Sequence, residues 1–305
     1  MTPSSQAHKL PTIACFGEIL WDLLPTGKQP GGAPFNVAVH LHQLGLPVRF
    51  ISRVGADELG AELVDFVASK GVATDLVQHD STHRTGIVHA NVDNASEVVY
   101  DIVQPVAWDY IHYDKLVEAA VASADAFVFG SLAARQAGTR ETLYRLLESA
   151  KFKVFDVNMR PPHDTRAVVE HLLNQADMVK MNHHELAELM AWFGAEAEPA
   201  AAMPWLAQRF GLQAVCVTCG ADGALLWTNN QLYRAPGIAV PVQDTIGSGD
   251  SFLAALLKGW LTGQAPSEAL RFACATGALV ATRQGATPAF AEADVRALLT
   301  AAGGR

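Results

Sequence analysis

The sequence predicts an α/β fold in which helices cover a mainly parallel sheet. Short apolar runs alternate with segments whose apolar residues recur every three to four positions, as in strands followed by helices. Glycines stand before two of the helix-like segments, at 31–32 and 247–249. No internal repeat or low-complexity block interrupts the pattern. We therefore expect one sheet built from repeated strand–helix units.

Length and composition are typical of a single enzyme-sized domain. The chain has 305 residues, of which 50% are hydrophobic and 17% are charged. Its formal net charge of -9 argues against a nucleic-acid partner. No apolar run is long enough to span a membrane, and residues 1–10 lack the apolar core of a signal peptide. The cytoplasm is therefore the expected compartment, with no membrane partner.

The first half of the chain predicts strand–helix units interrupted by a hairpin. The predicted elements are strands at 13–16 and 19–24, a polar turn at 25–30, a helix at 37–44, a strand at 48–51, a helix at 61–70, paired strands at 85–92 and 96–103 with a turn at Asp93 and Asn94, and a helix at 109–122. The paired strands have no helix between them. Such an antiparallel insertion in an α/β pattern is a candidate lid over a site.

The second half returns to the alternation of strands and helices. The predicted elements are strands at 126–129, 153–157, 178–181, 215–219, 224–227 and 231–234, helices at 140–150, 186–192, 252–261 and 267–283, and a linker-like segment at 195–204. Apolar residues also alternate at Ile238, Val240 and Val242, which predicts a further strand before the second glycine turn.

Two groups of polar residues are candidates for binding a small ligand. Asp22 interrupts an apolar run, and Asn36 follows Gly31 and Gly32 with both a donor and an acceptor. An ordinary turn acid and an ordinary helix start explain these residues equally well.

Polar residues also follow two of the predicted strands. Asn158 and Arg160 come after the strand at 153–157, at the edge where ligands collect in open α/β sheets. Asn182 and Glu185 follow the next strand with the spacing of a capping box. They are interpreted either as that cap or as contacts for phosphate and magnesium-bound water. Arg160 is likewise either a ligand contact or a surface charge.

The segment from Asp244 to Phe252 carries the strongest indication of chemistry. Gly247 and Gly249 allow the backbone to turn sharply into the following helix, whose free amides can bind an anion. Asp250 lies in the first turn of that helix, where a carboxylate beside an anion hole suits phosphoryl transfer to an alcohol. The alternative is that Asp250 and Ser251 only cap the helix.

These motifs, in this order, resemble the PfkB, or ribokinase-like, carbohydrate kinase family from Gly17 to about Pro288. The matching segments are 244–252, with Ser248 in place of the usual alanine, Gly31 and Gly32 with Asn36, the segment 53–60, and Asn182 with Glu185. The resemblance implies a single ribokinase-like domain over residues 1–305, with α/β/α layers and a small β lid formed by about 17–30 and 84–107.

The resemblance also implies residue roles. Asp250 would take the proton from the sugar hydroxyl, Gly247, Ser248 and Gly249 would form the anion hole, and Arg160 would approach the phosphate. The implied sugar ligands are Asp22, Gly31, Gly32, Asn36, Asn158 and Asp250. The implied nucleotide site comprises Asn182, Glu185, Thr218, Gly220, Gly223, Gly249, Cys274 and Gly277, with Cys274 where some relatives place a histidine against adenine.

The implied cofactors are ATP and Mg²⁺, with Glu185 holding Mg²⁺ through water. Some members of the family also hold K⁺ near the glycine turn. The matching positions here are Asp244 and the backbone carbonyls of Val280, Arg283 and Gly285, while Ala289 stands where some relatives offer a hydroxyl. The exposed edges of the lid suggest a homodimer formed through it.

The acceptor is predicted from the segment Asp156 to Arg160, which resembles the Asp-x-Asn-x-Arg segment of fructokinase-like members. The expected reaction is transfer of the ATP γ-phosphate to a primary hydroxyl of fructose, giving fructose 6-phosphate. Ribose and 2-keto-3-deoxygluconate are the alternative acceptors. A catalytically silent sugar or nucleotide sensor is the alternative of a different class, which the presence of Asp250 and Glu185 disfavours. No Gly-x-Gly-x-x-Gly follows the first strand, which argues against a dinucleotide-binding dehydrogenase.

Overall fold

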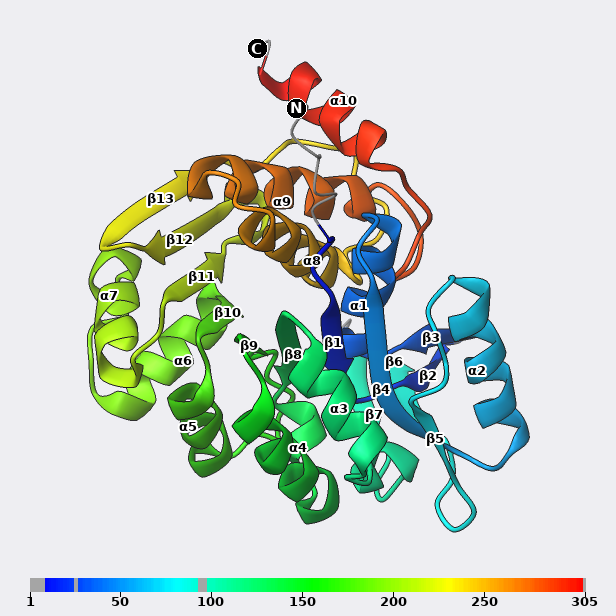
Figure 1. The fold of residues 1–305 in the computed structure, drawn as a ribbon. Helices are drawn as coiled ribbons and strands as arrows, with labels where there is room; N and C mark the ends of the chain where they lie inside the picture. Colours follow the sequence, from blue (N-terminus) through cyan, green and yellow to red (C-terminus); the bar gives the residue numbers. More distant parts are fainter. Residues whose placement is uncertain (1–8, 25–26, 93–97, 304–305) are drawn as a thin grey trace, which may run out of the picture.

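The structure, a computed structural model, describes residues 9–24, 27–92 and 98–303 (Figure 1). Over these residues it contains a nine-stranded sheet and a separate four-stranded sheet. The order of the large sheet is β13-β12-β11-β10-β9-β8-β1-β4-β5. Its strands are β1 (Ile13–Phe16), β4 (Val48–Gly55), β5 (Val77–Asp80), β8 (Ala126–Gly130), β9 (Lys153–Asp156), β10 (Met178–Asn182), β11 (Ala214–Thr218), β12 (Ala224–Thr228) and β13 (Gln231–Ala235). Pairing is parallel from β5 to β11, and β12 and β13 add antiparallel at one edge.

Helices cover both faces of this sheet, which confirms the expected three-layer fold. The helices are α1 (Ala33–Gln43), α2 (Glu58–Ser69), α3 (Lys115–Ser123), α4 (Ala137–Ser149), α5 (Arg166–Gln175), α6 (His183–Phe193), α7 (Pro199–Phe210), α8 (Ser248–Leu261), α9 (Pro266–Ala281) and α10 (Glu292–Gly303). Apolar side chains of α1, α8 and α9 pack with one face of the strands, and those of α3 to α7 pack with the other. Short 3₁₀ turns lie at Ala107–Tyr110, Leu132–Ala134 and Gly220–Asp222.

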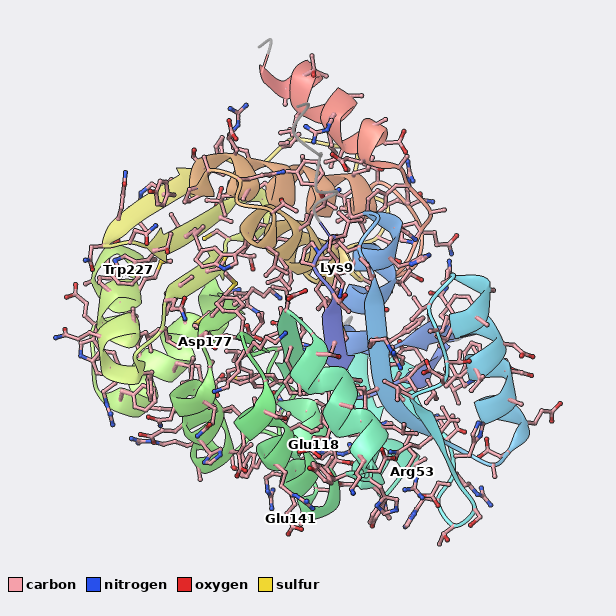
Figure 2. All side chains as sticks on the ribbon, viewed as in Figure 1. Lys9, Arg53, Glu118, Glu141, Asp177 and Trp227 are labelled. Atoms are coloured by element: carbon pink, nitrogen blue, oxygen red, sulfur yellow. The ribbon has the colours of Figure 1, made fainter. Side chains whose placement is uncertain are left out.

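Side chains divide between a core and a charged surface as this layering requires. Phe16, Phe127 and Phe155 are fully buried between the sheet and the helices. Charged side chains such as Glu141 on α4 point outward (Figure 2). Among the described residues, no helix is both long and apolar enough to cross a membrane.

The small sheet is the expected lid. Its order is β3-β2-β6-β7, formed by β2 (Leu20–Leu24), β3 (Gly27–Gly31), β6 (Gly86–Val92) and β7 (Val98–Ile102). The prediction of a polar turn at 25–30 was wrong for its second part, because Gly27–Gly31 pairs antiparallel with β2 as a strand. The antiparallel pairing of β6 with β7 agrees with the predicted hairpin. The predicted turn at Asp93 and Asn94 lies outside the described residues.

The strand predicted around Ile238, Val240 and Val242 is absent, since residues 236–247 form no strand. The sheet already ends at β13, and this segment instead crosses toward α8. Its backbone is held by bonds from the amides of Gln243 and Asp244 to the carbonyl of Ala281 at the end of α9. Ile238 packs against the core but Val242 is 62% exposed, so the alternating residues do not share one buried face.

Other boundaries differ where proline or local capping overrides composition. The predicted linker at 195–204 contains the start of α7, because Pro199 occupies the first turn, where its missing N–H costs nothing. The predicted helix at 109–122 is a 3₁₀ turn followed by α3, which begins after Asp114 caps it. The strand β5 and the helices α5 and α10 are additions to the predicted set.

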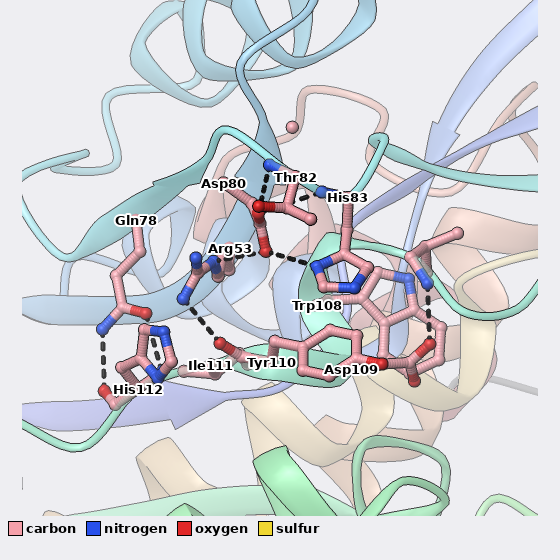
Figure 3. Close-up of polar contacts among 12 residues, drawn as sticks. Arg53, Gln78, Asp80, Thr82, His83, Trp108, Asp109, Tyr110, Ile111 and His112 are labelled. Carbon is pink, nitrogen blue, oxygen red and sulfur yellow. Dashed lines mark hydrogen bonds and ion pairs between the residues drawn. The ribbon is translucent and has the colours of Figure 1, made fainter.

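A salt bridge joins Arg53 to Asp80, at the start of the segment that leads into the lid strand β6 (Figure 3). The Nε of Arg53 on β4 lies 3.0 Å from Oδ2 of Asp80 on β5, and the same guanidinium donates to the carbonyl of Tyr110. His83 stacks on Tyr110 with ring centroids 3.8 Å apart. These contacts fix the segment just before β6 against the body.

A second ion pair fixes the other end of the lid. Arg135 and Asp109 have side chains that are 2% and 0% exposed, and their atoms approach to 2.7 Å. The Nη2 of Arg135 also donates to the carbonyl of Val103, just after β7, at 2.8 Å. Its guanidinium lies 3.9 Å from the centre of the Trp108 ring. Both ends of the β6–β7 hairpin are therefore anchored by buried charges.

Arg135→Met is expected to lower the free energy of unfolding by about 3 to 5 kcal/mol, because it leaves the Asp109 carboxylate buried and unpaired. Urea denaturation followed by circular dichroism measures the change. Lys151→Met serves as the control, since the Lys151–Asp125 pair is exposed and its atoms lie 3.9 Å apart. The control should lose less than about 1 kcal/mol. Equal losses in the two variants would contradict the anchoring role.

Candidate active site

A polar cluster forms where the C-terminal ends of the parallel strands meet the first turns of α1 and α8. The side-chain amide of Asn36, on α1, donates to Oδ2 of Asp250, on α8, at 2.8 Å. The two residues are 214 positions apart in the sequence. The structure therefore brings the two glycine-led segments into one site.

The glycine turn before α8 has the conformation that the sequence predicted. Gly247 has a φ of 77°, in the left-handed region, and a Cβ there would lie 2.2 Å from the carbonyl oxygen of Ala286. Within the described residues, no acceptor takes the amide hydrogens of Gly247, Gly249 or Asp250. These amides stand at the positive end of the α8 dipole and can bind an anion.

Ser248 differs from its expected role in the anion hole. Its amide donates to the carbonyl of Thr245 at 3.2 Å, because the chain makes a tight turn before the helix begins. The amide is therefore already engaged, unlike those of Gly247 and Gly249. The Ser248 hydroxyl is buried without a partner among the residues that the structure describes.

Asp250 has the electrostatic setting of a general base. Its pKa is raised to about 6, chiefly by desolvation and also by the Asp156 charge, while Lys180, Asn36 and Arg160 act in the opposite direction. A carboxyl that titrates near the operating pH is both largely ionised at neutral pH and basic enough to accept a proton. Asp250 is the third residue of α8 and therefore lies directly beside the free amides.

Glu18, just after β1, is a carboxylate of this cluster that the sequence analysis did not single out. It is 2% exposed, and its Oε1 accepts a bond from the amide of Ala33 at the start of α1. Its pKa is raised to about 7, chiefly by burial and also by the Asp250 charge, while backbone hydrogen bonds and the Arg160 charge act in the opposite direction. A carboxylate directly after the first parallel strand was the available signal, since ligands collect at that edge.

The expected sugar-binding residues lie together on the lid side of the cluster. Asp22 is on β2, where burial raises its pKa to about 6 against the opposing charge of Arg160. Gly31 and Gly32 are needed for close packing: a Cβ on Gly31 would lie 2.3 Å from Oδ2 of Asp22, and one on Gly32 would lie 2.4 Å from the Glu18 carbonyl. Gly31 thus packs within the lid against β2, and Gly32 packs against the segment that follows β1.

Asn158 and Arg160 extend from the end of β9 toward the same cluster. Asn158 has a φ of 40°, a left-handed conformation that is uncommon for a residue with a side chain. Arg160 is exposed, and its charge lowers the pKa values of Glu18, Asp22 and Asp250. The Arg160 charge therefore acts on all three carboxylates, although the residue is exposed to solvent.

The expected nucleotide-binding residues line the adjacent edge of the sheet. Asn182 and Thr218 are register partners at the ends of β10 and β11. Gly223 has a φ of 96° in the turn after β11, and a Cβ there would clash with the Ala235 carbonyl. Gly277 on α9 packs against the start of α8, where a Cβ would lie 3.1 Å from the Ser248 carbonyl oxygen. Gly220 and Cys274, the latter buried on α9, border the same region.

Asn182 and Glu185 form the capping box that their spacing allowed. The Asn182 side chain accepts from the amides of His184 and Glu185, while Oε2 of Glu185 accepts from the Asn182 amide at 2.7 Å. Oε1 of Glu185 accepts from the Met159 amide at 2.8 Å, which ties the segment after β9 to α6. Both carboxylate oxygens already bond to the backbone, so a cation here would be reached through water.

The described residues contain no group of three His, Cys, Asp or Glu side chains that could hold a metal ion. Glu185, whose two carboxylate oxygens accept bonds from backbone amides, fits an indirect contact with a Mg²⁺ ion that keeps its waters and binds phosphate oxygens.

The candidate residues for a monovalent cation meet at the end of α9. Oδ2 of Asp244 accepts a bond from the amide of Gly285 at 2.9 Å. The carbonyl of Val280 accepts from the Arg283 amide at 2.9 Å, and the Arg283 side chain bonds to the carbonyl of Ala289. The structure thus places Asp244 beside the loop whose carbonyls were predicted to be ligands.

Comparison with known proteins gives the same assignment over nearly the whole chain. The family model for the pfkB family carbohydrate kinases matches residues 16–293. Fructokinase-2 of Solanum habrochaites is 30% identical over 312 residues, covering 92% of this chain and 94% of the relative.

Solved structures of similar proteins have the same fold. The crystal structure of fructokinase from Xylella fastidiosa with bound ATP is 28% identical, with a TM-score of 0.84 over 95% of this chain and 98% of that one. The fructokinase of Vibrio cholerae O395 in its fructose, ADP and calcium ion bound form is 26% identical, with a TM-score of 0.82 over 95% and 99% of the two chains. A double mutant of that enzyme is described in a fructose, ADP and potassium ion bound form. The ribokinase-like fold expected from the sequence is confirmed.

The buried Glu18 carboxyl predicts a pH-dependent stability. Its pKa is about 7 in the folded protein against an ordinary value of 4.5, so the folded state binds the proton more tightly. The stability that this proton binding contributes is present below pH 4.5 and is lost as the pH rises through about 7. Glu18→Gln removes this dependence, so its stability relative to the wild type should grow by about 2 to 3 kcal/mol across that window.

Urea denaturation at several pH values between 4 and 8 measures this difference. Glu148→Gln, an exposed position on α4, is the matched control and should keep a constant offset from the wild type. A constant offset for Glu18→Gln as well would contradict the assignment of a buried, proton-binding carboxyl.

Proposed function

The chain belongs to the pfkB family of carbohydrate kinases, and on that premise we propose that it transfers the γ-phosphate of ATP to fructose, giving fructose 6-phosphate. Members of this family are phosphotransferases that act on an alcohol group. The observation that carries the proposal is the hydrogen bond from Asn36 to Asp250 beside the free amides of the glycine turn. It supports the proposal because the Asp250 carboxylate, the Asn36 side-chain amide and the unbonded backbone amides of the turn lie within one cluster, as a base, a hydroxyl-binding group and an anion hole would need.

In the proposed reaction the acceptor hydroxyl lies against the Asp250 carboxylate. As the hydroxyl oxygen bonds to the γ-phosphorus, the bond from that phosphorus to the bridging oxygen of ADP breaks, and the proton passes to Asp250. The amides of Gly247 and Gly249 would stabilise charge on the transferred group, and Arg160 would approach it. A bound Mg²⁺ would neutralise phosphate charge, with Glu185 contacting it through water.

Fructose is favoured by two observations. The relatives compared above are named fructokinases, and the Vibrio cholerae enzyme is described with fructose and ADP bound. In this chain Asn158 and Arg160 follow β9 in the fructokinase-like spacing, and the Arg160 charge acts on Asp22 and Asp250. Potassium is proposed as a second cation beside Asp244, which its contact with Gly285 supports.

The proposal includes the arrangement of the whole chain. Residues 1–305 would act as one domain, and the lid of about 17–30 and 84–107 would close over the sugar and exclude water. The strands at the edges of the lid sheet, β3 and β7, are the surfaces that would pair in a homodimer. The cytoplasm, where ATP is available, is the proposed compartment.

The first experiment measures ADP release by the purified protein with ATP, Mg²⁺ and K⁺. Fructose, ribose and 2-keto-3-deoxygluconate are supplied in parallel, and turnover is expected with fructose. Turnover with another sugar alone would discard the acceptor and keep the kinase mechanism. Binding of ATP without turnover on any sugar would favour the silent sensor instead.

Asp250→Asn is expected to lower kcat by roughly 10²–10⁴-fold, because the amide cannot accept the proton. The fold and the affinity for ATP should stay unchanged, since Asn keeps the shape and can still contact Asn36. Steady-state kinetics and calorimetric titration with an ATP analogue measure the two quantities. Asp65→Asn, at an exposed position on α2, is the control and should leave both unchanged. Near-wild-type turnover of Asp250→Asn would overturn the assignment of the base.

A further inference from the structure

A buried ion pair that the proposed mechanism does not use lies directly beneath the glycine turn. Lys180 on β10 and Asp156 on β9 are register partners on adjacent parallel strands, so their side chains share a face of the sheet. Nζ of Lys180 lies 3.0 Å from both carboxylate oxygens of Asp156, and the two side chains are 8% and 5% exposed. The shared face is the one covered by α8, since Val154 and Met178, two residues earlier, pack with that helix.

The ammonium group of Lys180 reaches the turn itself. A Cβ placed on Gly249 would lie 3.3 Å from Nζ of Lys180, so the charged group packs against the residue that precedes Asp250. In the part of the chain that the structure describes, the hydrogen bonds of the Lys180 ammonium group go to Asp156 alone. An ammonium group has three N–H donors, so it retains a donor beyond the two bonds to Asp156.

The charged groups that act on Asp250, or on which it acts, come from the segments at the ends of β1, β9 and β10, while α1 contributes the neutral Asn36. Asp156 on β9 and Glu18 after β1 are the neighbouring carboxylates, and Lys180 and Arg160 are the cations that lower the pKa of Asp250. Arg160 is exposed, so water screens its charge, whereas Lys180 is buried and acts through protein.

Lys180 keeps its charge in this setting. Burial lowers its pKa, but the carboxylates of Asp156, Asp250 and Glu185 raise it above the ordinary value. A buried ion pair contributes little net stability compared with an apolar pair of the same volume. Stability alone is therefore a weak reason for placing a charged pair at this position.

We propose that Lys180 is a positioning residue for phosphoryl transfer, whose buried ammonium supports the glycine turn and holds Asp250 in the carboxylate form that accepts the proton. The inference rests on the proposed function, because it gives Lys180 a role through Asp250. Asp156 fixes the ammonium at this position and balances part of its charge.

The test is the pH profile of kcat/KM for Lys180→Met, with fructose or whichever acceptor supports ADP release. Loss of the nearby positive charge should move the acid limb of the profile up by about 1 to 2 pH units. The double variant Lys180→Met with Asp156→Asn leaves no unpaired buried charge and keeps the test open if the single variant does not fold. The acid limb of the double variant should lie between those of the wild type and Lys180→Met. The double variant loses both the Lys180 charge, which lowers the pKa of Asp250, and the Asp156 charge, which raises it.

Lys258→Met is the matched control. Lys258 lies near the other end of α8, where it is 15% exposed and paired with Glu292. This variant loses a partly buried lysine on α8, the helix that carries Asp250, and should keep the wild-type acid limb. Folding of each variant is checked by circular dichroism. An acid limb that stays at the wild-type pH in folded Lys180→Met or in the double variant would overturn the proposal.

A second readout separates this inference from the proposed function. The titration of the Asp250 side chain can be followed by carbon NMR on protein labelled at the aspartate carboxyl carbon, with Asp250→Asn identifying the signal. The Asp250 signal should titrate at higher pH in Lys180→Met even if no sugar tested is phosphorylated. An unchanged titration midpoint would refute the role of Lys180, whatever the acceptor turns out to be.

Discussion

The hydrogen bond between Asn36 and Asp250 is the contact on which the rest of the site depends. It joins the first turn of α1 to the first turn of α8, and both helices start with glycines that let backbone approach backbone. Parallel strands run in the same direction, so their C-terminal ends all lie at one edge of the sheet, where the segments that follow them meet. The lid glycines, the β9 segment and the turn before α8 therefore converge, although they come from opposite ends of the sequence.

This convergence buries several carboxyl groups close together, which disfavours their charged forms. The folded-state pKa values of Glu18 and Asp250 are raised chiefly by desolvation, and neighbouring carboxylates raise them further, Asp250 acting on Glu18 and Asp156 acting on Asp250. Apolar side chains of similar volume at these positions would give a more stable protein than the buried charged groups do. The same desolvation makes Asp250 a stronger base and makes the charge of Lys180 effective over a short distance. Stability and chemistry are thus opposed at these residues.

Much of the fold could be predicted because its signals are local. The parallel strands are short apolar runs with helical periodicity between them, and the lid hairpin lacks that intervening helix. The failures occurred where the presence or absence of a tertiary partner overrode the local pattern. Ile238, Val240 and Val242 alternate like a strand, but β13 already ends the sheet. Residues 27–31 look like a polar turn, but they become a strand because β2 offers an unpaired edge.

The layered α/β fold, the two glycine-led helices and the order of the motifs could be predicted because they depend on residue type and spacing along the chain. Which charged groups lie close together depends on how distant segments pack. The tertiary structure placed Glu18 next to Asp250, set Lys180 beneath Gly249, and engaged the Ser248 amide within its own turn. The pKa of a carboxyl depends on desolvation and on charges a few ångströms away. Those neighbours come from strands and helices far apart in the sequence, so no local pattern contains them.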